Sequence, residues 1–297
     1  MSAADPAGGS AIAWEDVPRF TAAAVERVLA AAREADTAPL VALDIDGTLL
    51  GHDGSLAPEV IDGVARLREA GVHVVLATGR SVPALLPVAH WLGLDSGYAV
   101  CSNGAVTITL RRDGGYDLVS EVTFDAGPAV RAMLAEDPEV IVAVEDLGQG
   151  FKATRHFPAG ELSAPTQLVD LEELLAEPVS RVVLRAPTRT SDHFSEMVAR
   201  AGLHGVTYAV GWTAWLDLTP PGVSKASALD VVRETYGVPA GATLAAGDGQ
   251  NDREMLQWAA LGVAMGSADA GTIAVADVVT GHVDENGVVP VLRAALP

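Results

Sequence analysis

A short apolar run at residues 40–43 is followed at once by Asp44, Ile45, Asp46, Gly47 and Thr48. The run has the length of a strand covered on both faces, and a glycine just beyond it permits a sharp turn. In an open α/β sheet, ligands bind at the carboxyl ends of the strands. The feature therefore predicts a buried strand that delivers charged side chains to the ligand-binding edge of a sheet.

Asp44 and Asp46 are two residues apart, so on an extended backbone their side chains would leave from the same face. Like charges about 4 Å apart repel by roughly 4 kcal/mol at an effective dielectric constant of 20. Either one acid would hold its proton or a cation would lie beside the pair. The alternative is an exposed turn, because Asp, Gly and Thr are common turn residues. This stretch alone leaves both interpretations open.

Polar residues follow three further apolar runs in the same way. The sequence places Thr78-Gly79-Arg80 after 72–77, Ser102-Asn103-Gly104 after 98–101, and Gly247-Asp248 after 243–246. Segments with helical spacing, 58–70 and 81–92, separate the first runs. Strands that alternate with helices form parallel sheets. The sequence therefore predicts an α/β fold with a doubly wound, Rossmann-like parallel sheet and polar residues along one edge.

The pattern changes after residue 104. Two alternating runs around 111–115 predict a β-hairpin, and short strands then alternate with helices until Thr219-Pro220-Pro221. We interpret this region as an inserted α+β cap domain. The predicted units are 1–38, a tail (1–10) with an extra helix at 17–35; 39–104 with 219–297, the catalytic core; and 105–218, the cap.

The charge balance excludes several partners. The chain has 39 acidic and 19 basic residues and a formal net charge of −20, without a Lys/Arg-rich run. Such a protein is not expected to bind nucleic acid or an anionic membrane. Cys101 is the single cysteine, which fits a reducing compartment. The sequence has neither a membrane-spanning apolar run nor the start of a secretory signal, so we predict a cytoplasmic location.

Four stretches together resemble the motifs of the haloacid dehalogenase-like (HAD) phosphohydrolases, in that family's order. They are Asp-Xaa-Asp-Gly-Thr-Leu at 44–49, Leu-Ala-Thr-Gly-Arg at 76–80, Gly-Val-Ser-Lys at 222–225 and Gly-Asp-Gly-Gln-Asn-Asp at 247–252. The Cof-like sugar-phosphatase branch is the most similar, since it also carries an equivalent of Ser-Asn-Gly at 102–104. The resemblance runs from about residue 40 to the C-terminus and implies a Rossmann-like core with an inserted cap.

The resemblance also implies a reaction. Asp44 would be the nucleophile that becomes an aspartyl phosphate, and Asp46 would give a proton to the leaving alcohol and later take one from water. Anionic neighbours would help Asp46 to hold its proton. Asp44, Asp248 and the backbone carbonyl of Asp46 would bind Mg²⁺, which prefers such hard oxygen ligands; the set lacks the His and Cys typical of zinc.

Other motif residues would bind the phosphoryl group. Thr78 and Lys225 would hold its oxygens, Asn251 would reach it, and Gly79 and Asn103 are further candidates. Asp252 would orient either the water shell of the metal or Lys225, from outside the set of direct ligands. The sequence leaves Arg80 open between a structural ion pair and a functional role.

Substrate choice is expected to lie in the cap, because the core residues contact only phosphate and metal. Lys152, Arg155 and His156 form its most polar stretch and are candidates for substrate contact, although a solvated strand face explains them too. Trp212 and Trp215 could stack on a sugar ring or pack in the core.

These features predict a Mg²⁺-dependent phosphatase of small phosphorylated metabolites, with sugar phosphates as the expected class. Two alternatives stay open. A phosphomutase would return the phosphoryl group to sugar, and a non-catalytic sugar-phosphate-binding regulatory protein would keep the pocket without turnover.

Overall fold

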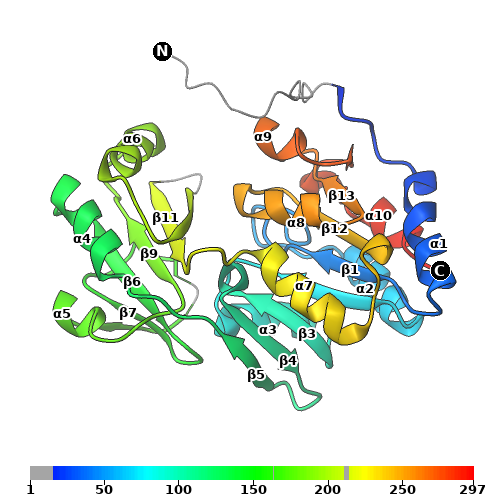
Figure 1. The fold of residues 1–297 in the computed structure, drawn as a ribbon, viewed down its shortest axis with the longest axis horizontal. Helices are drawn as coiled ribbons and strands as arrows, with labels where there is room; N and C mark the ends of the chain where they lie inside the picture. The colour runs from blue at the N-terminus through cyan, green and yellow to red at the C-terminus, as the bar shows by residue number, and fades with distance from the viewer. Residues whose placement is uncertain (1–15, 163, 211–213) are drawn as a thin grey trace.

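The computed structural model describes residues 16–162, 164–210 and 214–297, which form two sheets that lie side by side (Figure 1). The tail predicted at 1–10 and Trp212 lie outside the described residues. The larger sheet has eight strands and the smaller has six.

The larger sheet has the order β14-β13-β12-β1-β2-β3-β4-β5. Its strands are β1 (Leu40–Leu43), β2 (His73–Ala77), β3 (Gly97–Cys101), β4 (Val106–Leu110), β5 (Tyr116–Glu121), β12 (Thr243–Gly247), β13 (Leu261–Ala264) and β14 (Val278–Val279). Strand β1 pairs in parallel with both β12 and β2, with Leu43 opposite Ala246 and Leu76. The chain turns toward β2 after β1 and toward β13 after β12, so the order reverses between β1 and β12, where an open sheet binds its ligand.

Helices cover both faces of this sheet. They are α2 (Pro58–Glu69), α3 (Val82–Trp91) and α10 (Val289–Ala294) on one face, and α7 (Lys225–Tyr236), α8 (Arg253–Trp258) and α9 (Ala270–Ile273) on the other. Alternate residues of β1 face opposite ways: Val41 and Leu43 pack with the first group, and Leu40 and Ala42 with the second. The predicted doubly wound core is therefore confirmed.

The extra N-terminal helix is shorter than the sequence pattern predicts. The turn η2 (Ala22–Val25) and the helix α1 (Glu26–Glu34) replace the expected helix at 17–35, and Val25, Val28 and Leu29 pack into the core beside α2 and α10. Phe20 donates its N–H to the Val279 carbonyl at 2.8 Å, which extends the chain beside β14. This pairing holds residues 18–20 out of the helix.

The predicted hairpin at 105–123 belongs to the larger sheet rather than to the insert. Strand β4 pairs antiparallel with β3, and β5 pairs with β4. The turn between β3 and β4 contains three consecutive positive φ angles, 51° at Ser102, 54° at Asn103 and 102° at Gly104. This reverses the chain onto its own preceding strand. The predicted start of the cap at residue 105 is therefore too early, and the core sheet is mixed rather than all parallel.

The smaller sheet has the order β10-β11-β9-β6-β7-β8. Its strands are β6 (Ile141–Asp146), β7 (Gly150–Ala153), β8 (Thr166–Leu168), β9 (Val182–Arg185), β10 (Thr207–Val210) and β11 (Trp215–Thr219), and its helices are α4 (Gly127–Glu136), α5 (Leu171–Leu174) and α6 (Ser191–Ala201). The helices pack on the side that faces away from the larger sheet (Figure 1). The opposite face, with Phe151, is free of helices and turns toward the core.

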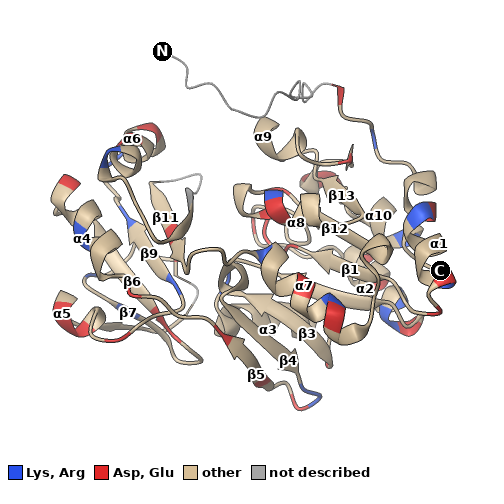
Figure 2. Ribbon diagram, viewed as in Figure 1, with Lys and Arg blue, Asp and Glu red and all other residues tan. Residues whose placement is uncertain are grey.

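The charges of the chain are dispersed. Acidic residues are spread over the helices of both parts, including α4, α5, α6 and α7 (Figure 2). Among the described helices, none combines the length and apolar character needed to cross a bilayer.

Candidate active site

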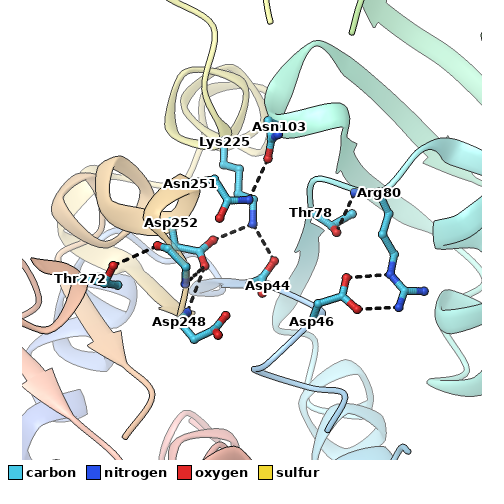
Figure 3. Close-up of polar contacts among 11 residues, drawn as sticks. Asp44, Asp46, Thr78, Arg80, Asn103, Lys225, Asp248, Asn251, Asp252 and Thr272 are labelled. Carbon is cyan, nitrogen blue, oxygen red and sulfur yellow. Dashed lines mark hydrogen bonds and ion pairs between the residues drawn. The ribbon is translucent and has the colours of Figure 1, made fainter. Parts of the chain in front are cut away.

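Four strand ends and one helix start meet at the edge where the strand order reverses (Figure 3). Asp44 follows β1, Asp248 follows β12, Thr78 follows β2 and Asn103 follows β3, while Lys225 opens α7. Because the carboxyl ends of parallel strands lie along one edge, residues 181 positions apart, Asp44 and Lys225, come into direct contact.

Lys225 is the centre of this cluster. Its Nζ donates to Asp44 Oδ1 and to Asp252 Oδ1, each at 2.6 Å, and its side chain is 0% exposed. The helix that carries it is anchored just before it, because the Ser224 hydroxyl accepts the Ser227 N–H and the Ser227 hydroxyl accepts the Ser224 N–H. A lysine is almost never fully buried unless it is paired, so these carboxylates explain its position.

The start of α7 lies directly against Gly104. A Cβ at position 104 would collide with the Ser224 carbonyl oxygen and approach the Lys225 nitrogen to 3.2 Å. We expect Gly104→Ala to displace α7 and to lower turnover about 100-fold, as a misplacement of about 1 Å does. Gly237→Ala is the matched control: its φ is also positive, at 69°, but its Cβ would meet open space. This control should lose only about 1–2 kcal/mol of unfolding free energy, with unchanged turnover. Equal effects of both substitutions on turnover would contradict the role of this contact.

Three acids compete for the one lysine. Carboxylate oxygens of Asp44, Asp248 and Asp252 lie within 4.8 Å of one another. Burial, together with repulsion from Asp252, raises the pKa of Asp44 well above its usual value, even though Lys225 opposes the shift. The same two causes raise the pKa of Asp248 to about 7. Burial by itself would lower the pKa of Lys225, but attraction to Asp252 and Asp44 raises it. Both members of the Asp44–Lys225 pair thus shift upward, because negative charge is in excess, and a further cation would relieve it.

The remaining oxygens identify the acids that can accept such a cation. Asp252 uses Oδ1 for Lys225 and Oδ2 for the N–H groups of Asp248, at 3.0 Å, and Gly249, at 2.8 Å. In the described part of the chain, no side chain donates to the Asp248 carboxylate, and Asp44 keeps Oδ2 free. The chemistry of this set, hard carboxylate oxygens with excess negative charge, fits Mg²⁺ or a similar divalent ion.

The surroundings of Gly47 show why the first motif contains a glycine. Its φ is 80°, and a Cβ there would lie 2.6 Å from Asp248 Cγ and collide with Oδ2. A side chain at position 47 would therefore push Asp248 out of the acid cluster.

Asp46 turns away from the other acids, toward Arg80 (Figure 3). Arg80 Nε donates to Asp46 Oδ2 at 2.8 Å and Nη2 to Oδ1 at 2.6 Å, and 58% of the Asp46 side chain is exposed. The side chains of Asp44 and Asp46 diverge, because the strand ends at Leu43 and the extended backbone that would align them does not continue. The acid crowded by other acids is Asp44. Arg80 forms an ion pair with Asp46 and also lines the cavity described below.

The residues predicted to bind the phosphoryl group lie next to the acid cluster. Thr78 is 1% exposed, and its hydroxyl accepts the Arg80 N–H at 3.1 Å. Asn251 Nδ2 donates to Asn103 Oδ1 at 2.9 Å. Thr78, Gly79 and Asn251 line the cavity described next, whereas Asn103 lies behind Asn251.

A cavity of about 270 Å³ lies between the two sheets above these residues. Its floor contains the acids Asp44, Asp46 and Asp248. The smaller sheet and its loops provide the roof, whose residues are Phe151, Glu161, Leu162, Arg181 and Trp215.

Lys152, Arg155 and His156, the substrate contacts expected from the sequence, are not among the lining residues of this cavity. Lys152 follows Phe151 in β7, and neighbouring strand residues point to opposite faces, so one of the two faces the cavity and the other does not. Arg155 lies beyond the strand and pairs with Glu139 at 2.8 Å. Sequence reasoning missed Arg181, whose signal is a charged residue at the start of an otherwise apolar strand segment.

Comparisons with known proteins agree with this geometry. The model of the haloacid dehalogenase-like hydrolase family matches residues 41–292. A phosphoglycolate phosphatase of Natronomonas pharaonis is 32% identical over 244 residues, which are 82% of this chain and 91% of the relative. The pyridoxal phosphate phosphatase YbhA of Escherichia coli is 30% identical and covers 82% of this chain and 94% of its own.

A solved structure shares the fold as well. The HAD phosphatase BT1666 from Bacteroides thetaiotaomicron superposes with a TM-score of 0.70 and 28% identity, over 87% of this chain and 95% of that one. The motif resemblance, the fold and these relatives lead to the same assignment. The chain belongs to the haloacid dehalogenase-like hydrolases, in their Cof-like branch, and is a phosphoric monoester hydrolase.

Proposed function

We propose that this protein is a Mg²⁺-dependent phosphatase that hydrolyses small phosphorylated metabolites through an aspartyl-phosphate intermediate. The observation that carries the proposal is the contact between Asp44 and the buried ammonium of Lys225, at 2.6 Å, on the floor of the cavity. The ammonium fixes one carboxylate oxygen and thereby orients the carboxylate of Asp44 in the cavity. The same positive charge is then in place for the phosphoryl oxygens.

The reaction divides into two displacements. In the first, a carboxylate oxygen of Asp44 attacks phosphorus, the bond from phosphorus to the leaving oxygen breaks, and Asp46 gives that oxygen a proton. In the second, Asp46 takes a proton from water, which attacks phosphorus and releases Asp44 and inorganic phosphate. Arg80 holds Asp46 at the cavity wall as a carboxylate. An incoming phosphate monoester offers Arg80 a second partner, and Asp46 then takes up from solvent the proton that it gives to the leaving oxygen; the proton taken from water in the second step restores it for the next turnover.

The phosphoryl group would be held from several directions. Thr78 contributes a hydroxyl, Lys225 a buried cation and Asn251 an amide, and Gly79 offers a backbone N–H at the cavity wall. Asn103 would act through Asn251, which donates to it. Preorganised donors of this kind lower the barrier because they need no reorganisation as charge moves.

Asp44 and Asp248 would hold the metal, together with the backbone carbonyl of Asp46. When bound, Mg²⁺ would neutralise part of the charge on the phosphoryl oxygens. Asp252 has a supporting role, because it fixes Lys225 and the backbone of residues 248–249.

The substrate range follows from size and from the relatives. A cavity of about 270 Å³ is small for a ligand site, so it suits a phosphoryl group with a compact leaving group. The relatives named above act on phosphoglycolate and pyridoxal phosphate, and sugar phosphates lie in the same size range. We infer a metabolite of this size.

Chelation tests the metal. Treatment with EDTA is expected to lower hydrolysis of 4-nitrophenyl phosphate at least about 100-fold, and Mg²⁺ should restore it, because charge neutralisation by the ion accounts for several kcal/mol of the barrier. Ca²⁺ is a control, since its larger and looser coordination should support little turnover. Full activity in chelator would contradict the metal assignment.

The same assay separates the alternatives. Release of inorganic phosphate without a bisphosphate activator is expected of a phosphatase and not of a phosphomutase. A protein that binds phosphorylated metabolites but releases no phosphate in Mg²⁺ would instead be a regulatory binding protein.

A further inference from the structure

Arg181 is the cation of the cavity roof. It directly precedes β9, only 7% of its side chain is exposed, and it lines the same cavity as Asp44 and Asp46. Its backbone is fixed to the core through one intermediary: Glu145 donates its N–H to the Arg181 carbonyl at 3.0 Å, and the Ser102 hydroxyl of the core donates to the Glu145 carboxylate. Arg181 is therefore held in place above the catalytic edge.

The guanidinium of Arg181 is only partly used. Nε donates to Asp217 Oδ1 at 2.7 Å, and Nη2 lies 2.6 Å from the same oxygen. Among the hydrogen bonds of the described residues, none uses Nη1 of Arg181. A buried guanidinium with an unused donor edge favours an acceptor oxygen supplied by the ligand.

The other polar groups of the roof are already occupied. Both carboxylate oxygens of Glu161 accept from Arg185, at 2.7 and 2.8 Å. The Trp215 indole N–H donates to Asp217 Oδ2 at 3.1 Å, and the Trp215 ring packs edge-on against Phe157 with centroids 5.8 Å apart. These contacts leave the rings of Trp215 and Phe151, with Leu162, as apolar wall.

Among the described residues, the cations of the floor lie on the side of the phosphoryl group. Lys225 pairs with Asp44 and Asp252, and Arg80 pairs with Asp46 and donates to the Ala84 carbonyl. When the phosphoryl group lies on the floor, the rest of the substrate points toward the roof. There it meets an apolar wall and the unused Nη1 donor of Arg181.

We propose that Arg181 is a specificity-determining residue, and that it selects phosphate monoesters whose leaving group is a single flat ring with an acceptor oxygen on the side away from the phosphate. The ring packs on Trp215 and Phe151, and the oxygen, a carboxylate or a carbonyl, accepts from Arg181. A cavity of about 270 Å³ has room for a phosphoryl group and one ring. This inference rests on the proposed phosphatase function and narrows its substrate class.

A pair of probes isolates the contact. Benzyl phosphate and 4-carboxybenzyl phosphate present the same ring and the same primary alcohol, and differ by the distal carboxylate. We expect the wild-type kcat/KM to favour the carboxylated probe by about 10- to 100-fold, the range of a charge-assisted hydrogen bond in a buried site.

The substitutions at Arg181 are chosen so that no buried charge is left without a partner. Arg181→Met alone would leave the Asp217 carboxylate without its cation, so it is combined with Asp217→Asn, which keeps an oxygen for Trp215. We expect this double variant to reduce the preference to near one, and Arg181→Lys, measured as a second variant, to retain part of it. Arg155→Met is the control, because Arg155 lies outside the cavity, and it should keep the wild-type preference.

The outcomes are distinct. Wild-type protein that hydrolyses both probes with a ratio near one overturns the inference and leaves the phosphatase function intact, and so does an unchanged preference in the Arg181 variants. Wild-type protein that hydrolyses neither these probes nor 4-nitrophenyl phosphate in Mg²⁺ overturns the proposed function, and the inference with it.

Discussion

Asp44→Asn is expected to remove turnover, by at least about 10⁴-fold, without loss of folding. The amide cannot form the acyl phosphate, so the first displacement has no nucleophile. The fold should persist because the charge of Asp44 is itself unfavourable there: burial and Asp252 raise its pKa, and the isosteric amide removes one of three competing acids. Lys225 keeps Asp252 as a partner. Phosphate release and urea unfolding without metal measure the two effects separately.

Asp53→Asn is the matched control for this experiment. Asp53 lies in the loop that follows the same motif, is exposed, and contacts the Ser55 N–H rather than the acid cluster. Its substitution should leave turnover unchanged. If Asp44→Asn retained more than a tenth of wild-type turnover, Asp44 would no longer be a credible nucleophile.

Lys225→Met is expected to affect stability and activity together. Removal of one partner from a buried ionic cluster leaves Asp44 and Asp252 uncompensated, which typically costs about 3–5 kcal/mol. Loss of the preorganised cation should also lower turnover by about 10²–10³-fold. Urea unfolding of the metal-free protein gives the first quantity, and Mg²⁺ should recover part of it, because a divalent ion offsets the same excess of negative charge.

Lys152→Met provides the comparison, since Lys152 is the other lysine of the sequence and lies on the smaller sheet, outside the catalytic cavity. Its unfolding free energy should change by no more than about 0.5 kcal/mol. A Lys225→Met protein as stable as Lys152→Met would mean that the carboxylates around Lys225 are not charged in the folded protein.

The sequence was sufficient for the core and for the convergence of its motif residues. The polar residues of three motifs follow a strand of the larger sheet within a residue or two, so their place at the sheet edge is fixed by covalent connection once the strands are parallel. The closeness of Asp44 and Asp248 follows from that rule, whereas Lys225 reaches Asp44 from the start of α7, which packs against Gly104.

The local sequence pattern was insufficient to predict which side chains contact one another. Asp46 and Arg80 come from different strand ends, and their bidentate pair depends on the turn that begins after Leu43. The hairpin β4–β5 has the same alternating pattern whether it joins the core or the cap, and only the reversal at Ser102 and Asn103 decides the question.

The sequence by itself therefore determined the sheet, its ligand-binding edge and the acids and lysine that occupy it, because short-range order places Asp44 and Asp248 at strand ends and Lys225 at a helix start. The tertiary structure alone decided which residues form the roof. Side chains alternate along a strand, so Phe151 and Lys152 must face opposite sides of the sheet, but the alternation does not say which side faces the core. It also decided the direction of Asp46 and the partner of Arg181, because each of these hydrogen bonds joins segments that are distant in the sequence and become neighbours only when strands pair within one sheet.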